Sequence, residues 1–153
     1  MDRIERHKDL LVWHKAIQLA GKVYAVTRRL PSEERDGLSP QLRRTALSIP
    51  SSIAEGCARR TRTELLEFLQ VALGSLSELE TQLLISVEQD LLTVTECGFD
   101  QVAELSDLLA GLIRRLNTAA REAHAKACSP LTLADRTIGA ARRGNSGRQT
   151  LEP

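Results

Sequence analysis

The chain has 153 residues, of which 42% are apolar and 27% charged, and its formal net charge is +1. These values are ordinary for one soluble globular domain with a single core. No apolar run approaches the roughly 20 residues that cross a membrane, and the charged start MDRIERHKDLL is unlike a secretory signal. The three cysteines are far apart and odd in number, which is typical of reduced thiols. We therefore expect a cytoplasmic protein.

The charges are strongly segregated along the chain. Residues 1–62 hold 13 Lys or Arg and 7 Asp or Glu, and residues 114–153 hold 8 and 3. Residues 63–113 hold 10 acidic residues and no Lys or Arg. A purely acidic segment therefore lies between two basic ones.

The first predicted helix runs from about residue 10 to residue 29, and Pro31 ends it. Arg28 and Arg29 fall in its last turn, where they complement the helix dipole. Its apolar residues recur at helical spacing and predict one stripe that faces the core. The stripe consists of Trp13, Ala16, Ile17, Ala20, Val23, Tyr24 and Thr27.

The second predicted helix has Ser39 as its N-cap, Pro40 as its first residue and Gly56 just after its end. Glu55 lies in the last turn, where a carboxylate opposes the helix dipole. We therefore expect a structural salt bridge between Glu55 and a nearby arginine rather than a catalytic role. The predicted core residues are Leu42, Ala46, Ile49 and Ile53.

A proline interrupts this helical pattern in the segment SIPSSIAEG, residues 48–56. Pro50 has no N–H to donate to the preceding turn, and its ring crowds that turn, so we expect a kink. The hydroxyls of Ser48, Ser51 and Ser52 can satisfy the freed backbone groups. The segment therefore bends the helix around its neighbour, or it forms a binding surface.

The third predicted helix begins with a capping box formed by Thr61 and Glu64. Its apolar face is broader than a two-helix seam and needs neighbours on more than one side. Gly74 lies in its middle, where glycine costs about 1 kcal/mol relative to alanine, so we expect another backbone to approach it closely. The seam consists of Leu65, Leu69, Ala72, Leu76, Leu79 and Leu83.

The segment LLTVTECGF is expected to fray from helix into loop, and Asp100 is expected to cap a fourth helix that ends near Ala127. Its stripe consists of Val102, Leu105, Leu108, Leu109, Leu112, Ile113, Leu116 and Ala120. Beyond it, apolar periodicity is lost. The predicted organisation is an N-terminal arm at 1–9, a four-helix bundle at 10–127 and a flexible tail at 128–153.

The sequence resembles the bacterial four-helix-bundle family of S23 ribosomal proteins, also called 23S rRNA intervening-sequence proteins, from about residue 10 to residue 126. The resemblance lies in Trp13-x-x-Ala16, Tyr24, Pro31, Gly37-Leu38, Gln41-Leu42, Ser48-Ile49-Pro50, Ala54-Glu55-Gly56 and Ala72-x-Gly74-Ser75-x-x-Glu78. The chain has Ser52 where the family often has asparagine.

This resemblance implies an all-α, up-down four-helix bundle that assembles as a ring-like homopentamer without known enzymatic activity. The family is named from genes inside ribosomal RNA insertions, and related accessory proteins of diversity-generating retroelements bind RNA and a reverse transcriptase. RNA or a ribonucleoprotein is therefore an expected partner. The acidic and basic segments fit either a head-to-tail ring interface or pairing within one bundle.

Catalytic chemistry has little support in the sequence. His7, His14 and His124 lie outside any metal-binding spacing, and the third helix has no histidine for a di-metal bundle site. Cys57 follows a helix C-terminus, where a thiolate is disfavoured. We therefore expect no enzyme activity, no metal, no cofactor and no small-molecule substrate.

An arginine cluster supports nucleic-acid binding. Arg59, Arg60 and Arg62 lie between the second and third helices, with Arg43 and Arg44 upstream, and convergent guanidinium groups bind phosphate. Aromatic side chains for base stacking are scarce. Two hypotheses stay open. The protein is an oligomeric RNA-binding adaptor, or it is a structural, protein-interaction ring whose arginines serve assembly together with Ser48, Pro50, Glu55, Gly56 and Gly74.

Overall fold

The computed structural model describes residues 6–127, so the predicted tail at 128–153 lies outside the described residues. The chain divides into two units, residues 1–118 and residues 119–153. Of the second unit, only the end of the last helix is described.

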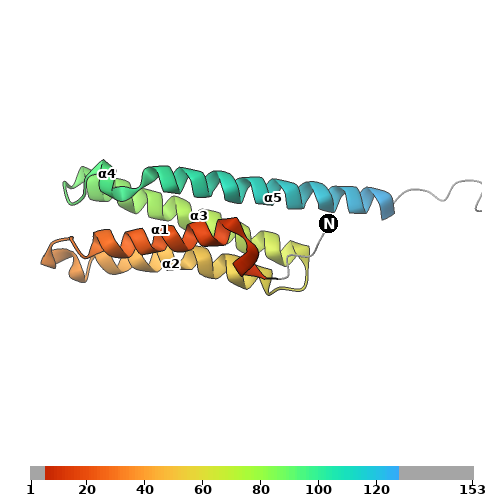
Figure 1. The fold of residues 1–153 in the computed structure, drawn as a ribbon, viewed down its shortest axis with the longest axis horizontal. Helices are drawn as coiled ribbons and strands as arrows, with labels where there is room; N and C mark the ends of the chain where they lie inside the picture. The colour runs from red at the N-terminus through yellow and green to blue at the C-terminus, as the bar shows by residue number, and fades with distance from the viewer. Residues whose placement is uncertain (1–5, 128–153) are drawn as a thin grey trace, which may run out of the picture. The chain divides into compact units, whose positions relative to one another are not determined.

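The first unit is a helical bundle, and residues 6–127 contain no strand. Four long helices follow one another in alternating directions (Figure 1), with a short fifth helix and two 3-10 helices between or before them. This arrangement confirms the all-α class and the bundle. The bounds are η1 (His7–Asp9), α1 (Leu11–Thr27), η2 (Ser32–Arg35), α2 (Leu38–Cys57), α3 (Arg62–Glu88), α4 (Val94–Cys97) and α5 (Phe99–Ala127).

The core is formed by apolar stripes on all four long helices, and leucine dominates those of α3 and α5. All predicted core residues of α2 and the whole predicted seam of α3 are buried. In the predicted stripe of α5, Val102, Leu105, Leu109, Leu112 and Leu116 are buried, and Leu108 and Ile113 are partly buried. The prediction is wrong at Ala120, which is exposed towards the end of α5. These stripes place the polar faces of α2 and α3 at the surface, where the candidate site lies.

The predicted stripe of α1 is wrong at Ile17, whose side chain is 45% exposed. The residues that face the core are Val12, Ala16, Leu19, Ala20, Val23, Val26 and Thr27. The prediction failed because almost every turn of α1 carries apolar residues on more than one face. The neighbouring helices then decide which face is buried.

The start of α2 also differs from the prediction. The helix begins at Leu38 and its N-cap is Gly37, so Ser39 is not the cap. The Leu38 N–H donates instead to Glu34 Oε2 at 3.0 Å, and Ser39 Oγ donates to the Thr27 carbonyl at 3.5 Å. A carboxylate from η2 therefore caps the helix, and Ser39 joins α2 to the end of α1.

The segment expected to fray forms the short helix α4. Thr93 and Glu96 make a second capping box, and the chain then turns at Gly98, which has a φ of 69°. Since α5 begins at Phe99, Asp100 lies in its first turn and is not its cap. This left-handed backbone conformation favours glycine at position 98, because other residues adopt it only with strain.

Candidate functional site

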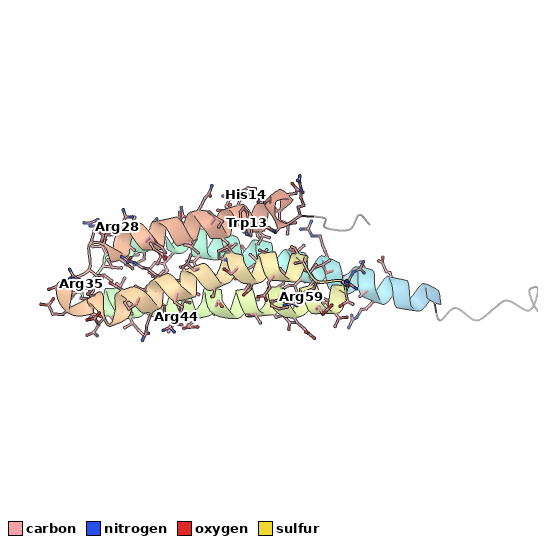
Figure 2. All side chains as sticks on the ribbon, turned by 90° about the horizontal axis from the view of Figure 1, so that it is seen from below. Trp13, His14, Arg28, Arg35, Arg44 and Arg59 are labelled. Carbon is pink, nitrogen blue, oxygen red and sulfur yellow. The ribbon has the colours of Figure 1, made fainter. Side chains whose placement is uncertain are left out.

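The arginines predicted to bind RNA lie in two groups, which Arg44 and Arg59 mark in Figure 2. Arg43 and Arg44 lie in its first half, whereas Arg59, Arg60 and Arg62 lie at the junction between α2 and α3. A helix rises about 1.5 Å per residue, so the two groups are roughly 20 Å apart. They cannot contact the same phosphate group.

The junction arginines are partly engaged within the chain. Arg59 Nη2 donates to Glu55 Oε1 at 3.0 Å, so the expected salt bridge of Glu55 is formed with Arg59. The Arg59 guanidinium also lies 4.6 Å from the centroid of the Phe68 ring. Arg60 and Arg62 have no ion-pair partner among residues 6–127. Two guanidinium groups therefore remain uncommitted at this junction.

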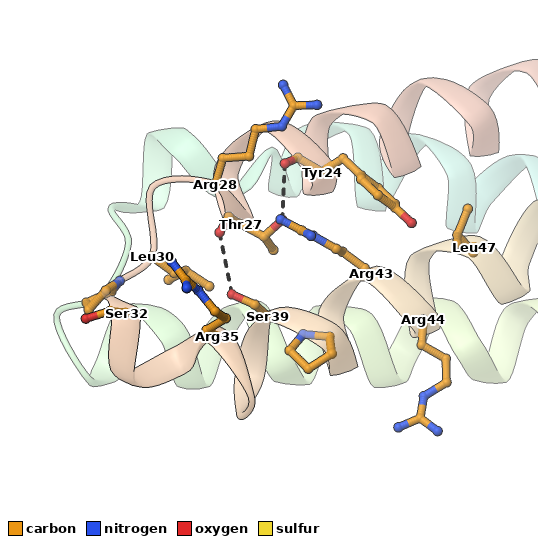
Figure 3. A pocket seen from close by; sticks show the side chains of 12 residues that line it. Tyr24, Thr27, Arg28, Leu30, Ser32, Arg35, Ser39, Arg43, Arg44 and Leu47 are labelled. Atoms are coloured by element: carbon orange, nitrogen blue, oxygen red, sulfur yellow. Dashed lines mark hydrogen bonds between the residues drawn. The ribbon is translucent and has the colours of Figure 1, made fainter.

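An open pocket of about 770 Å³ lies where the end of α1, η2 and the first half of α2 meet (Figure 3). Four arginines line it, Arg28, Arg35, Arg43 and Arg44, and no acidic side chain from the described part of the chain does so. We call it the arginine pocket. Its other lining residues are Tyr24, Thr27, Leu30, Pro31, Ser32, Ser39, Pro40 and Leu47.

Arg43 is held in place inside this pocket. Its Nε donates to Thr27 Oγ1 at 2.8 Å, and its guanidinium lies 5.1 Å from the centroid of the Tyr24 ring. Thr27 Oγ1 in turn donates to the Tyr24 carbonyl at 3.1 Å (Figure 3). This half-buried guanidinium is thus positioned before any ligand arrives.

The other three arginines of the pocket are exposed. Arg28 and Arg44 extend from opposite edges of the pocket (Figure 3), and Arg35 is contributed by η2. None of the three has an ion-pair partner within residues 6–127. Guanidinium groups without carboxylate partners bind phosphate oxygens through paired N–H donors.

Arg28 and Arg35 are site residues that the sequence pattern does not predict. Arg28 complements the helix dipole, and Arg35 lies in a turn-rich connection. The short connection between the first two helices was the signal that could have predicted them. A short link between antiparallel helices brings together the residues before and after it. The link between α1 and α2 therefore places both arginines beside Arg43 and Arg44.

The backbone of α2 stays helical across Pro50, which is buried. Ser48 Oγ donates to the Thr45 carbonyl at 2.7 Å, and Ser51 Oγ donates to the Leu47 carbonyl at 2.8 Å. These two carbonyls lie on either side of the one that loses its N–H donor at Pro50. Among the described residues, no serine hydroxyl bonds to the Ala46 carbonyl, which is the one that Pro50 frees, so the predicted role of these serines is wrong. The bend of α2 stays a prediction.

The two glycines of the predicted assembly set have opposite surroundings. Gly56 lies inside α2 and not after its end, and a Cβ there would lie 2.8 Å from Phe68 Cβ. A Cβ at Gly74 would meet nothing within 4 Å. The close approach predicted for Gly74 is therefore wrong within the described residues, because the glycine is on the exposed face of α3. It is Gly56 that allows close packing of α2 against α3.

The cysteines and the other possible metal ligands of the described residues form no reactive or metal-binding group. Burial raises the pKa of the Cys57 thiol, so the thiolate is disfavoured. Residues 6–127 contain no group of His, Cys, Asp and Glu side chains that fits a metal ion. No helix in the same range is both long enough and apolar enough to cross a membrane.

Fold and surface together define a helical-bundle protein with a basic pocket at one end of its first helix pair. Residues 8–118 match the model of the 23S rRNA-intervening sequence protein family. Because the match covers well over half of the chain, the protein belongs to this family.

A crystal structure from Bacteroides thetaiotaomicron, described as a protein with unknown function from the S23 ribosomal protein family, is similar in fold. Its TM-score is 0.63 at 22% sequence identity, and the match covers 68% of this chain and 96% of that chain. At this identity the similarity supports the fold alone. No curated protein matches the chain.

Proposed function

We propose that the protein is a non-enzymatic adaptor that binds RNA, or the RNA of a ribonucleoprotein, through the arginine pocket. The observation that carries the proposal is the gathering of four arginines around one pocket that has no acidic side chain from the described residues in its lining. Arg43 is preorganised by Thr27 and Tyr24. The family's description, 23S rRNA-intervening sequence protein, also favours an RNA partner.

The pocket favours contacts with the phosphate backbone over contacts with bases. Its only aromatic side chain, Tyr24, is already covered on one face by Arg43. Sequence-tolerant base stacking needs free aromatic faces, which are scarce here. Binding should therefore depend strongly on salt and weakly on sequence. Arg60 and Arg62 at the junction are candidates for a second contact with the same RNA.

A triple variant tests this proposal. Arg28→Ala, Arg35→Ala and Arg44→Ala together remove the three exposed guanidinium groups and leave Arg43 and the core intact. We expect weaker binding of a short fluorescent RNA in anisotropy titrations. Each single-strand phosphate contact contributes about 0.7 to the slope of log affinity against log salt, so the slope should fall by about two. The native mass from light scattering should not change.

The matched control is the triple variant Arg59→Ala, Arg60→Ala and Arg62→Ala. It removes the same charge from the opposite end of α2 and should lower the affinity less than the pocket variant does. Equal losses of RNA affinity in both variants would show that the arginine pocket contributes no more to binding than the junction arginines do. Failure of the unaltered protein to bind RNA at low salt would refute the proposed function.

We further propose that the protein acts as a ring-like homopentamer. Large apolar side chains remain exposed on α3, among them Val71, Leu84 and Ile85. Only two acidic residues from the segment 63–113, Glu96 and Glu104, pair with basic residues within the described chain. The remaining acidic surface of one copy is therefore free to face the basic surface of the next.

A structural ring with no nucleic-acid role is the second candidate function. Its support is the engagement of Arg59 with Glu55 and Phe68, which shows that part of the arginine cluster serves protein contacts. In that case the control triple variant at the junction would lower the native mass, and the unaltered protein would not bind RNA. The RNA titration and the native-mass measurement therefore distinguish the RNA-binding function from the structural one.

A further inference from the structure

A second, polar pocket lies next to the arginine pocket. It has a volume of about 490 Å³ and is lined by Gln41, Arg44, Thr45, Ser48, Ser75 and Glu78 from α2 and α3. We call it the polar pocket. Arg44 lines both pockets, so a ligand held by its guanidinium can enter either one. The chemistry of the two linings differs, because a carboxylate lines only the second.

Glu78 is an exposed residue whose carboxylate is hydrogen-bonded at the edge of this pocket. Its Oε1 accepts from Thr45 Oγ1 at 3.2 Å and from Gln82 Nε2 at 2.9 Å. Gln82 Nε2 also donates to Thr45 Oγ1 at 3.1 Å, which closes a three-membered network. Since Oε1 carries both bonds, the network fixes the carboxylate on the pocket wall.

This network has more acceptors than donors. Glu78 Oε2 has no hydrogen-bond partner among the described residues. Gln82 Oε1 is buried and also has no partner there. A carboxylate repels phosphate and accepts a hydrogen bond from a hydroxyl group. Dinucleotide-binding folds use an acidic side chain in this way to hold a ribose 2′-hydroxyl.

We propose that the polar pocket binds the ribose 2′-hydroxyl of the nucleotide whose phosphate lies on Arg44. The Glu78 carboxylate accepts a hydrogen bond from this hydroxyl, and the hydroxyls of Ser48 and Ser75 lie in the same lining. This inference rests on the proposed function and adds the class of nucleic acid. The 2′-hydroxyl distinguishes RNA from DNA, so the protein selects RNA over single-stranded DNA.

The test compares three fluorescent probes of identical sequence: RNA, DNA and 2′-O-methyl RNA. The unaltered protein should bind the RNA about tenfold or more tightly than the DNA, the range expected for one hydrogen bond to a charged group. The 2′-O-methyl RNA keeps the sugar shape of RNA and has no hydroxyl proton to donate. It should bind about as weakly as the DNA does.

Glu78→Gln is the informative variant. The new side-chain oxygen can still accept from Thr45 and Gln82, and the amide group presents a donor where the carboxylate presented an acceptor. The RNA preference should fall to about twofold or less. Glu80→Gln is the matched control, because it removes the same charge from a nearby position of α3 that does not line the polar pocket. It should keep the full preference.

The outcomes separate this inference from the proposed function. Equal binding of RNA and DNA by the unaltered protein, or an RNA preference that survives in Glu78→Gln, overturns the ribose assignment and leaves RNA-backbone binding intact. An RNA preference that 2′-O-methyl RNA retains also overturns it, because shape and not hydroxyl donation would then be recognised. Binding of none of the three probes overturns both proposals.

Discussion

Single residues show how surroundings decide the effect of one amino acid. Gly56 and Gly74 are both helical glycines, and intrinsic propensity disfavours each by about 1 kcal/mol relative to alanine. At Gly56, Phe68 and Leu65 occupy the space of a side chain, whereas at Gly74 that space is empty. Close packing therefore explains the first glycine, and nothing within the described residues explains the second.

Alanine substitutions at these glycines should have opposite effects. We expect Gly56→Ala to destabilise the protein by about 1–3 kcal/mol, because the added methyl forces α2 and α3 apart. Gly74→Ala should stabilise it by about 0.5–1 kcal/mol through helix propensity. Urea unfolding at equal protein concentration measures both. If Gly74→Ala lowers the stability and changes the native mass, Gly74 lies against another copy of the chain.

At the scale of helices, capping boxes define where α3 and α4 begin. Thr61 Oγ1 accepts from the Glu64 N–H at 3.2 Å, and Glu64 Oε2 accepts from the Thr61 N–H at 3.2 Å and from its hydroxyl at 2.6 Å. These bonds from Thr61 lower the pKa of Glu64. Thr93 likewise lowers the pKa of Glu96, which also pairs with Arg29. The ionised carboxylates therefore stabilise both helix starts.

The contribution of Glu64 should depend on pH in one direction. A carboxyl group with a lowered pKa in the folded state stabilises the protein above the unfolded value, about 4.3 for glutamate. That stabilisation is lost as the pH falls through the folded-state pKa. We therefore expect Glu64→Gln to lower the melting temperature at neutral pH and to have no effect in strong acid. Thermal unfolding across this range measures the difference.

A second variant checks the cause of this pH dependence. Thr61→Val removes the hydroxyl that lowers the pKa of Glu64, so the effect of Glu64→Gln should shrink at neutral pH in that background. A difference in melting temperature between the unaltered protein and the Glu64→Gln variant that grows towards acid pH would contradict the capping-box explanation.

At the scale of the whole molecule, an apolar surface and an acidic surface have no partner within the described residues. The buried stripes of the four long helices complete a core within the first unit. Val71, Leu84 and Ile85 on α3 remain about half exposed, and most of the acidic segment has no basic partner in the described residues. In the proposed ring, we expect a second copy of the chain to provide both an apolar and a basic partner for these surfaces.

Pro50→Ala tests whether the shape of α2 sets this assembly. Alanine restores the missing N–H donor and is the best helix former, so the bundle should stay folded. If Pro50 bends α2, its loss straightens the helix and changes the native mass in light scattering. Ser51→Ala, an exposed substitution in the same turn, is the control and should leave the mass unchanged. A Pro50→Ala protein with an unaltered native mass would rule out this role for the proline.

Local signals in the sequence determined most of the fold. The helical spacing of apolar residues specified which residues of α2 and α3 are buried, although α3 also carries exposed apolar residues outside its seam. The residues of the capping box specified the start of α3, because the hydrogen bonds involved are made within one turn. The same signal was present at Thr93 and Glu96, where the β-branched residues around them hid a short helix.

Only the tertiary structure decided the features that depend on neighbouring helices. The exposure of Ile17 follows from how the other helices lie around α1, since its sequence carries apolar residues on several faces. The arginine pocket combines residues from α1, η2 and α2, and the polar pocket combines α2 with α3. Residue types and short spacings specify local backbone structure, whereas a binding surface depends on contacts between segments that are distant in sequence.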